Sequence, residues 1–419
     1  MDKLVIDGGL SLKGEVTISG SKNSVLPILA ATLLTDEPCK IKGAPDLEDT
    51  VTMLKILRSL GKEAVMERDE IQIIGITSNH IADYELVSKM RASFCVLGPL
   101  ISKLKKAKVS LPGGCVIGVR PVDLHLKGLS TLGVKLGVVS GYIEADASSL
   151  KGRHVYLGGD FGSSVLATDN VMMAAVRAKG KTIIEAAACE PEVTDLANFL
   201  IKMGAKIKGH GTPIIEVTGV KELKGTDYKI IPDRIEVGTF ILAGLITKGE
   251  IIIKNCRPDH LGSLLDILKT MGAHIHCKKD SIRVKGNNSL KPINITTLPY
   301  PGFPTDLQAQ IMALLSVVKG ISVITEKIYP DRFMHVAELD RMGAQIQKEG
   351  PHAIIQGVKS LSGTTVMASD LRASAALVLA GLVAKGQTHI SRIYHLDRGY
   401  EDLEKKFEAL GAKIRREKE

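Results

Sequence analysis

The chain has 419 residues, which is enough for two or three domains with well-filled cores. Its formal net charge of +9 would suit a nucleic-acid partner, but tryptophan is absent and aromatic residues make up only 4% of the chain, so little is available for stacking on bases. The composition therefore disfavours nucleic-acid binding, and small anionic ligands explain the charge more simply.

Neither the first residues nor the cysteines indicate an exported or metal-binding protein. The sequence opens with MDKLVIDGG, which is not a basic and apolar leader, and no apolar run is long enough to span a bilayer. The cysteines lie far apart, without the spacing of a zinc site; they are Cys39, Cys95, Cys115, Cys189, Cys256 and Cys277. We therefore expect a soluble, cytoplasmic protein with free thiols, no metal and no membrane partner.

In chain order, the segments KLVIDGG and LKGEVTISG come first and are predicted to be strands. Beyond them the chain repeats itself. Six amphipathic helices each stop at a glycine, and these glycines recur about every 70 residues; they are Gly61, Gly133, Gly204, Gly272, Gly343 and Gly411. Glycine permits the left-handed conformation that ends many helices. A short alternating strand is expected after each of them.

A second helix in each repeat is apolar on almost all sides, which indicates burial. These helices are expected to begin near Lys22, Arg91, Ser163, Arg234, Asp306 and Arg372. The N-termini of buried helices at one end of a domain present free N–H groups and positive dipole ends, which predicts an anion site there. Ordinary capping is the simpler explanation for any one of these polar residues, but their recurrence in several repeats weakens it.

The six repeats divide into three and three near residues 229–232, where Pro232 precedes the fourth repeat. This pattern predicts an α/β protein with two similar domains, each containing three buried helices wrapped by sheets. The two strands at the start of the chain precede the first repeat and need not belong to the first half.

The segment Leu111–Leu126 reads LPGGCVIGVRPVDLHL and is predicted to be a loop, because one proline and two glycines stand near its start. It carries the thiol of Cys115 and the guanidinium of Arg120. A nearby cation favours the thiolate, which is the reactive form of cysteine. The alternative is a small cysteine buried in a turn.

Several motifs together carry a family resemblance. They are SKN at 21–23, MRAS at 90–93, PGGCVIGVRPVDLH at 112–125, FPTDLQAQ at 303–310, DRFMH at 331–335, DLRAS at 370–374 and HLDRGY at 395–400. With these motifs the chain resembles the enolpyruvyl transferases over nearly its whole length, and its cysteine loop is similar to that of the members that act on UDP-N-acetylglucosamine. The members that act on shikimate phosphate lack this loop. The resemblance implies a two-domain inside-out α/β barrel built from six repeats of about 70 residues. Residues 22–230 would form one domain, and residues 1–21 would complete the domain of residues 231–419.

The resemblance also implies an activity that needs no cofactor. The members with this cysteine loop transfer the enolpyruvyl group of phosphoenolpyruvate to the 3′-hydroxyl of UDP-N-acetylglucosamine and release phosphate. This is the first committed step of peptidoglycan synthesis, on which cell-wall growth, cell shape and cell division depend. Cys115, on a mobile loop, would donate a proton to the methylene carbon and could also form a pyruvate adduct. Asp306 would act as the base, and the epoxide fosfomycin would alkylate Cys115.

The remaining site residues are expected to contact the two substrates. By resemblance, the phosphate of phosphoenolpyruvate lies among Lys22, Arg120 and Arg398, with Arg332 and Arg372 nearer its carboxylate. The UDP-sugar contacts would be Asn23, Arg91, Arg120, Pro121, Val122, Asp123, Leu124, Asp306 and Ile328. Structural roles remain open as alternatives: Asp306 could be only an N-cap, and the two arginines nearer the carboxylate could form structural ion pairs.

One stretch departs from the family pattern. Residues 157–164 read LGGDFGSS, which is longer and richer in glycine than the family's basic loop and has an acid in place of a lysine. A Gly-Ser-Ser helix start can still bind diphosphate through backbone N–H groups. Two other functions stay open: an enolpyruvyl transferase with another acceptor, such as shikimate 3-phosphate, and a silent paralogue that only binds UDP-sugar.

Overall fold

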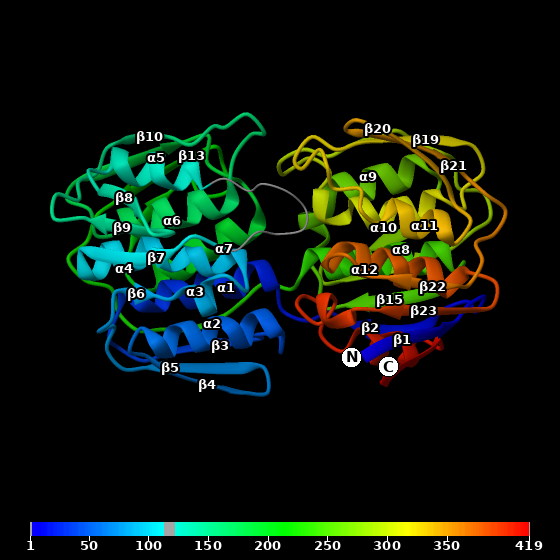
Figure 1. The fold of residues 1–419 in the computed structure, drawn as a ribbon, viewed down its shortest axis with the longest axis horizontal. Coiled ribbons are helices and arrows are strands. Elements are labelled where there is room, and N and C mark those ends of the chain that lie inside the picture. The colour runs from blue at the N-terminus through cyan, green and yellow to red at the C-terminus, as the bar shows by residue number, and fades with distance from the viewer. Residues whose placement is uncertain (1, 113–121, 419) are drawn as a thin grey trace. The chain divides into compact units, whose positions relative to one another are not determined.

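The computed structural model describes residues 2–112 and 122–418 and divides them into two compact units. The N-terminal unit comprises residues 20–112 and 122–231, and the C-terminal unit comprises residues 2–19 and 232–418. Each unit is built from three βαβαββ repeats (Figure 1). The first helix of every repeat is buried and the second has an exposed face, as the two helix patterns predict. The predicted α/β architecture, with helices inside and sheets outside, is therefore confirmed; the sheets stay separate as six four-stranded sheets.

The elements of the N-terminal unit have the following bounds. Its helices are α1 (Lys22–Ala31), η1 (Thr32–Leu34), α2 (Glu48–Ser59), α3 (Tyr84–Val87), η2 (Arg91–Val96), α4 (Leu97–Leu104), α5 (Asp123–Thr131), α6 (Val165–Ala175) and α7 (Pro191–Lys202). Its strands are β3 (Cys39–Lys42), β4 (Glu63–Glu67), β5 (Glu70–Ile74), β6 (Ile81–Ala82), β7 (Lys106–Ser110), β8 (Lys135–Val139), β9 (Tyr142–Asp146), β10 (His154–Tyr156), β11 (Lys181–Glu185), β12 (Lys206–Lys208), β13 (Ile214–Thr218) and β14 (Asp227–Lys229).

The elements of the C-terminal unit include the first two strands of the chain. Its helices are α8 (Arg234–Ile246), η3 (Pro258–Leu261), α9 (Gly262–Thr270), η4 (Thr305–Leu307), α10 (Gln308–Leu315), α11 (Val336–Arg341), α12 (Leu371–Val383), η5 (Ile393–His395) and α13 (Leu403–Ala409). Its strands are β1 (Asp2–Asp7), β2 (Lys13–Thr17), β15 (Glu250–Lys254), β16 (His274–Cys277), β17 (Ser281–Lys285), β18 (Ile295–Thr296), β19 (Ile321–Thr325), β20 (Gln345–Glu349), β21 (His352–Gln356), β22 (Thr365–Met367), β23 (Gln387–Ser391) and β24 (Lys413–Lys418).

All six sheets share one strand order. Across each sheet, the first and second strands pair in parallel, and the second and third and the third and fourth strands pair antiparallel, as in β18-β19-β21-β20. Three sheets borrow a strand from a distant part of the chain. β1 completes the sheet of β22, β23 and β24, while β2 pairs with β15 and β14 pairs with β3. β2 and β14 hold equivalent places in their sheets. β2, in the C-terminal unit, leads into α1 of the N-terminal unit, and β14, in the N-terminal unit, leads into α8 of the C-terminal unit. The chain thus passes from each unit to the other by the same kind of link, from a first strand to a buried helix.

The periodic glycines end their helices as predicted. Each has a positive φ; the values run from 89° at Gly133 and Gly411 to 106° at Gly204. In each case the residue after the glycine donates a backbone hydrogen bond to a carbonyl in the last helical turn, for example Lys62 to Leu57 at 3.0 Å and Ala344 to Leu339 at 3.0 Å. This is the Schellman geometry, and it recurs at all six sites.

The segments that follow these glycines correct one prediction. Five of them are hairpins of two strands, such as β4 and β5, instead of a single alternating strand, whereas Gly411 is followed by the single strand β24, which pairs with β1 from the start of the chain. In the first hairpin the turn is made by Arg68, whose φ is 57°, and Asp69. Both residues are charged, so the turn interrupts the alternation without a glycine or proline to mark it.

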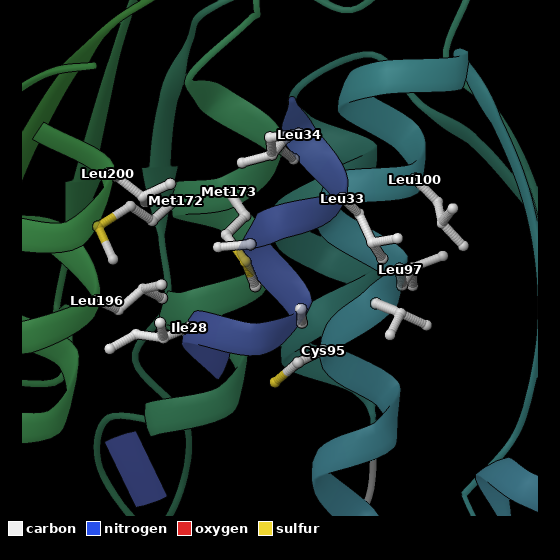
Figure 2. Close-up of a cluster of buried hydrophobic side chains, with 14 of the residues drawn as sticks. Ile28, Leu33, Leu34, Cys95, Leu97, Leu100, Met172, Met173, Leu196 and Leu200 are labelled. Atoms are coloured by element: carbon white, nitrogen blue, oxygen red, sulfur yellow. The ribbon is translucent and has the colours of Figure 1, made fainter. Parts of the chain in front are cut away.

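The core of the N-terminal unit shows why the first helices are apolar all round. Figure 2 shows α1 between two other helices, with Ile28 near Leu196 of α7 and Leu33 near Leu97 of α4. Leu33, Leu97 and Leu196 have no exposed surface. Because neighbours surround α1 on several sides, a polar face on this helix would be desolvated, so burial leaves polar residues only at its start.

Candidate active site

In the C-terminal unit, one carboxylate lies between two guanidinium groups. Asp306 Oδ1 accepts from Arg332 Nη1 at 2.7 Å, and Asp306 Oδ2 accepts from Arg372 Nη2 at 2.8 Å. The side chains of Arg332 and Arg372 are only 7% and 4% exposed, whereas that of Asp306 is 27% exposed. Two desolvated cations therefore converge on one acid that still has access to solvent or ligand.

The repeat places two of these residues at equivalent points. Asp306 lies in η4, just before α10, and Arg372 is the second residue of α12. Asp370 caps α12 by accepting from the backbone N–H of Arg372 at 2.8 Å and of Ala373 at 3.1 Å. Arg332 comes from the loop that follows β19. The starts of two buried helices and one loop thus bring these charges together.

The charges around Asp306 determine its protonation. Burial alone would raise the pKa of Asp306, but the charges of Arg372 and Arg332 and their hydrogen bonds hold it well below the usual value. The acid is therefore ionised across the neutral range. An acid of such low pKa is a weak base as long as both arginines are engaged with it.

A second group of side chains holds the backbone of Asp306. Gln310 Nε2 donates to the carbonyl oxygen of Asp306 at 2.9 Å and to the hydroxyl of Tyr400 at 3.1 Å. Tyr400 also shares a 2.8 Å hydrogen bond with Thr239, and its ring lies 5.7 Å from the guanidinium of Arg372. Burial raises the pKa of Tyr400, so the phenol stays protonated. This network locks the start of α10 and one face of an arginine together.

In the N-terminal unit, the predicted cation at the start of α1 has an acidic partner. Lys22 Nζ lies 2.7 Å from Asp49 Oδ2 in the first turn of α2, and the two side chains are 11% and 5% exposed. Asn23 follows in α1 and is half-buried, and Arg91 begins η2. The charge of Arg91, after burial, helps to lower the pKa of His125 to about 3. His125 Nδ1 lies 2.9 Å from Asn170 Nδ2, so the amide donates to a neutral ring.

Two predicted nucleotide-binding segments adjoin each other in the same unit. Val122 caps α5, and Asp123 and Leu124 are its first residues. A Cβ built on Gly159 would lie 3.0 Å from Leu124 Cδ1, so the glycine-rich stretch 157–164 packs directly against the start of α5. Gly159 and Gly162 exchange backbone hydrogen bonds of 3.1 and 3.0 Å, which makes the stretch a tight turn.

The other predicted site residues have the following positions. Ile328 lies in the loop after β19, and its N–H donates to Glu326 at 2.8 Å. Arg398 lies in the turn between η5 and α13, and its charge contributes, after burial, to lowering the pKa of His395. Cys115, Arg120 and Pro121 lie outside the described residues.

Sequence reasoning missed the partners of the charged groups. Asp49, Gln310 and Tyr400 each contact a predicted site residue, but none of them stood in a predicted site. The only signal for Asp49 is its place in an acidic first helical turn, which ordinary helix-dipole effects also explain. Gln310 and Tyr400 do fall inside the family-like motifs FPTDLQAQ and HLDRGY.

Residues 2–112 and 122–418 contain neither a membrane-spanning helix nor a metal-type cluster of side chains. No helix there combines the length and the apolar character that a membrane crossing requires. No cluster of three or more histidine, cysteine, aspartate or glutamate side chains in these ranges has the arrangement of a metal site.

The sequence and the structure match one group of known proteins end to end. The sequence model of the EPSP synthase (3-phosphoshikimate 1-carboxyvinyltransferase) family matches residues 6–407. The UDP-N-acetylglucosamine 1-carboxyvinyltransferase of Methylacidiphilum infernorum is 53% identical over 416 residues, which cover 99% of each chain. UDP-N-acetylglucosamine 1-carboxyvinyltransferase 2 of Carboxydothermus hydrogenoformans is 55% identical over 420 residues, again covering 99% of each chain. The UDP-N-acetylglucosamine 1-carboxyvinyltransferase of Lawsonia intracellularis is 53% identical over 419 residues, which cover 100% of both chains.

Solved structures with the same fold have lower sequence identity. The enolpyruvyl transferase NikO from Streptomyces tendae has a TM-score of 0.89 and 25% identity, covering 99% of this chain and 98% of its own. An EPSP synthase from Acinetobacter baumannii has a TM-score of 0.76 and 19% identity over 100% of both chains. The second likeness is evidence for the fold alone.

Proposed function

The chain belongs to the enolpyruvyl transferase family, and we propose that it transfers the enolpyruvyl group of phosphoenolpyruvate to the 3′-hydroxyl of UDP-N-acetylglucosamine. The observation that carries this proposal is the similarity of more than half of all positions, along the whole chain, to curated enzymes named for that reaction. The protein is thus a transferase of peptidoglycan synthesis. The unpaired cysteines of the described ranges, Cys39, Cys95, Cys189, Cys256 and Cys277, support a place in the reducing cytoplasm.

The reaction proceeds by addition and elimination. In the addition, the sugar 3′-oxygen bonds to C2 of phosphoenolpyruvate, its proton passes to a base, and C3 gains a proton from an acid. In the elimination, a proton leaves C3, the C2–O bond to phosphate breaks, and the double bond returns. Atoms balance without a metal or cofactor. The protein must supply one acid, one base and cations for the phosphate and carboxylate.

We assign the base to Asp306 and the acid to Cys115, following the family resemblance. The low pKa of Asp306 is at first sight a difficulty, because a weak base removes a hydroxyl proton poorly. The anionic substrate offers a solution. When the carboxylate of phosphoenolpyruvate binds Arg332 and Arg372, those guanidiniums share their charge with a second anion. The pKa of Asp306 then rises toward its usual range, so that substrate binding itself activates the base.

The remaining cations surround the phosphate in this proposal. Lys22, Arg120 and Arg398 bind the phosphate oxygens, and the buried pair of Lys22 with Asp49 orients the ammonium group. The UDP-sugar contacts Asn23, Arg91, Ile328 and the segment 120–124. The turn at Gly159 packs against Leu124 and, in this proposal, contributes backbone N–H groups to the diphosphate. The partners are these two small molecules, without nucleic acid.

Two alternatives have less support. A transferase with another acceptor would share the fold and the acid–base pair, but the end-to-end identity is to enzymes named for UDP-N-acetylglucosamine. A silent UDP-sugar-binding paralogue would not need both an acid and a base. Phosphate release from phosphoenolpyruvate, measured with UDP-N-acetylglucosamine and separately with shikimate 3-phosphate, distinguishes the three. Release with the first acceptor alone supports the proposal, and release with neither favours the silent paralogue.

A further inference from the structure

A buried glutamate lies behind the cluster of Asp306 and its arginines. Glu326 directly follows β19 and has no exposed surface. Four donors point at its carboxylate. Thr297 Oγ1 (2.7 Å) and the N–H groups of Ile328 (2.8 Å) and Tyr329 (3.0 Å) bond to Oε1, whereas Oε2 accepts from Thr305 Oγ1, at 2.9 Å. Within the described ranges no lysine or arginine is ion-paired directly with this acid.

The hydroxyl of Thr305 connects Glu326 to the site. It has one proton, which it donates to Glu326, so its oxygen can only accept from a further neighbour. That neighbour is Arg332, whose Nη1 donates to Thr305 at 3.0 Å and to Asp306 at 2.7 Å. The acid thus orients the hydroxyl, and the hydroxyl presents a lone pair to the guanidinium.

A second connection runs along the loop after β19. The N–H of Tyr329 bonds to Glu326, and the carbonyl of Tyr329 accepts from the backbone N–H of Arg332 at 2.8 Å. The ring of Tyr329 lies 5.8 Å from the guanidinium carbon of Arg332. Both oxygens of Glu326 therefore lead to Arg332 by hydrogen bonds, one through a side chain and one through the backbone.

We infer that Glu326 is a positioning residue for enolpyruvyl transfer, which acts through Thr305 to hold Arg332 against Asp306. The inference rests on the proposed function for its kinetic meaning, but the alignment of Arg332 does not depend on which acceptor is used. Small misplacement of catalytic groups lowers rates strongly, so loss of this alignment should be visible in turnover.

Three substitutions test the connection. In Glu326→Gln, the three donors that now bond to Oε1 should keep the amide oxygen at that position, so the NH₂ group would face Thr305. The hydroxyl proton of Thr305 would then have to point in another direction. Thr305→Val removes the hydroxyl, whereas Thr305→Ser retains it. Thr297→Val is the matched control, because Thr297 also donates to Glu326 and accepts a backbone N–H, from Lys327 at 2.9 Å, but does not contact Arg332.

Steady-state turnover is measured for each variant, with thermal unfolding as a check of folding. We expect kcat to fall about tenfold or more in Glu326→Gln and Thr305→Val and to stay within about threefold in Thr305→Ser and Thr297→Val. The kcat of the double variant Glu326→Gln/Thr305→Val should lie within about twofold of the kcat of the poorer single variant, because both substitutions interrupt the same chain of hydrogen bonds. A purely structural role predicts additive losses and an equal effect of Thr297→Val, either of which would overturn the inference.

Crystal structures of wild type and Thr305→Val keep the two proposals separate. If wild type releases no phosphate, the proposed function fails, but the position of Arg332 can still be measured. The inference expects Arg332 Nη1 to move out of hydrogen-bond distance of Asp306, beyond about 3.5 Å. An unchanged Arg332 in that variant contradicts it. If Glu326→Gln does not fold, the Thr305→Val and Thr305→Ser pair decides by the same criteria.

Discussion

Asp306 accepts a 2.8 Å hydrogen bond from Arg372, although 66 positions separate the two residues in the chain. They stand at the starts of the buried helices of consecutive repeats, so the repeat itself places a carboxylate beside a guanidinium. Arg332 adds a second cation from a loop. The cluster therefore depends on the packing of neighbouring repeats and not on any local motif.

The pairing of Asp306 predicts a stability that depends on pH. Asp306→Asn leaves two buried guanidiniums without their anion, so we expect the free energy of unfolding at pH 7 to fall by about 1–3 kcal/mol. The folded-state pKa of Asp306 is depressed, so its stabilisation is present above about pH 4 and is lost as the pH falls through the folded pKa. Urea unfolding of both proteins at pH 7 and at about pH 3.5 measures this, and the difference between them should have begun to narrow at the lower pH.

The control for this prediction is Asp331→Asn. Asp331 is a surface acid, 86% exposed and 3.8 Å from Lys348, so its loss should change the free energy of unfolding by less than about 0.5 kcal/mol at either pH. If Asp306→Asn is as stable as wild type at pH 7, the two arginines are not held by this acid.

The cations that we place around phosphate should matter for catalysis. Lys22→Ala and Arg398→Ala should each lower kcat/KM by an amount equivalent to about 2–4 kcal/mol of transition-state stabilisation. Arg398→Lys should recover only part of the loss, because a point charge cannot replace a planar fork. Lys108→Ala, which removes a partly exposed lysine of β7 paired with Glu144 of β9, is the control and should stay within about twofold of wild type. Near wild-type rates in both alanine variants would show that the phosphate site lies elsewhere.

The periodic glycines predict a cost that comes from the backbone alone. At Gly343 φ is 90° and a Cβ would meet no atom within 4 Å, so Gly343→Ala should destabilise by about 1 kcal/mol through strain. Gly137 also has open space around a Cβ but lacks a positive φ, so Gly137→Ala should cause no loss. Chemical unfolding of the two variants compares them directly. Equal stability would argue against the helix-ending role of these glycines.

The two roles of Cys115, as proton donor and as nucleophile, should be separable by substitution. An aspartate can deliver a proton but opens epoxides far more slowly than a thiolate does, so Cys115→Asp should keep turnover and escape fosfomycin. Cys115→Ser should lose turnover, because a hydroxyl is too weak an acid. Mass spectrometry of intact protein with the epoxide and UDP-N-acetylglucosamine should show one adduct on wild type and none on Cys115→Asp. An adduct on another cysteine would remove the basis for this assignment.

The sequence predicts the repeats well because glycine spacing and apolar helices are local signals. The helix pattern places Asp306 and Arg372 at the starts of buried helices, and only the family resemblance names Arg332. The contacts among the three cannot be predicted from the sequence, since they join distant repeats. The hairpin turn at Arg68 escaped prediction because two charged residues form it. The role of Glu326 was not predicted either, because an acid at the end of a strand is normally a surface residue, and its four hydrogen-bond donors are apparent only in the structure.

In the proposed mechanism, substrate anions release Asp306 to act as the base for transfer to UDP-N-acetylglucosamine. The most direct test is phosphate release from phosphoenolpyruvate by wild type and Asp306→Asn, each with UDP-N-acetylglucosamine and with shikimate 3-phosphate. We predict rapid release by wild type with the UDP-sugar alone and a loss of about a hundredfold or more in Asp306→Asn, since a catalytic base typically contributes that much. Release with shikimate 3-phosphate, or an unimpaired Asp306→Asn, would contradict the account.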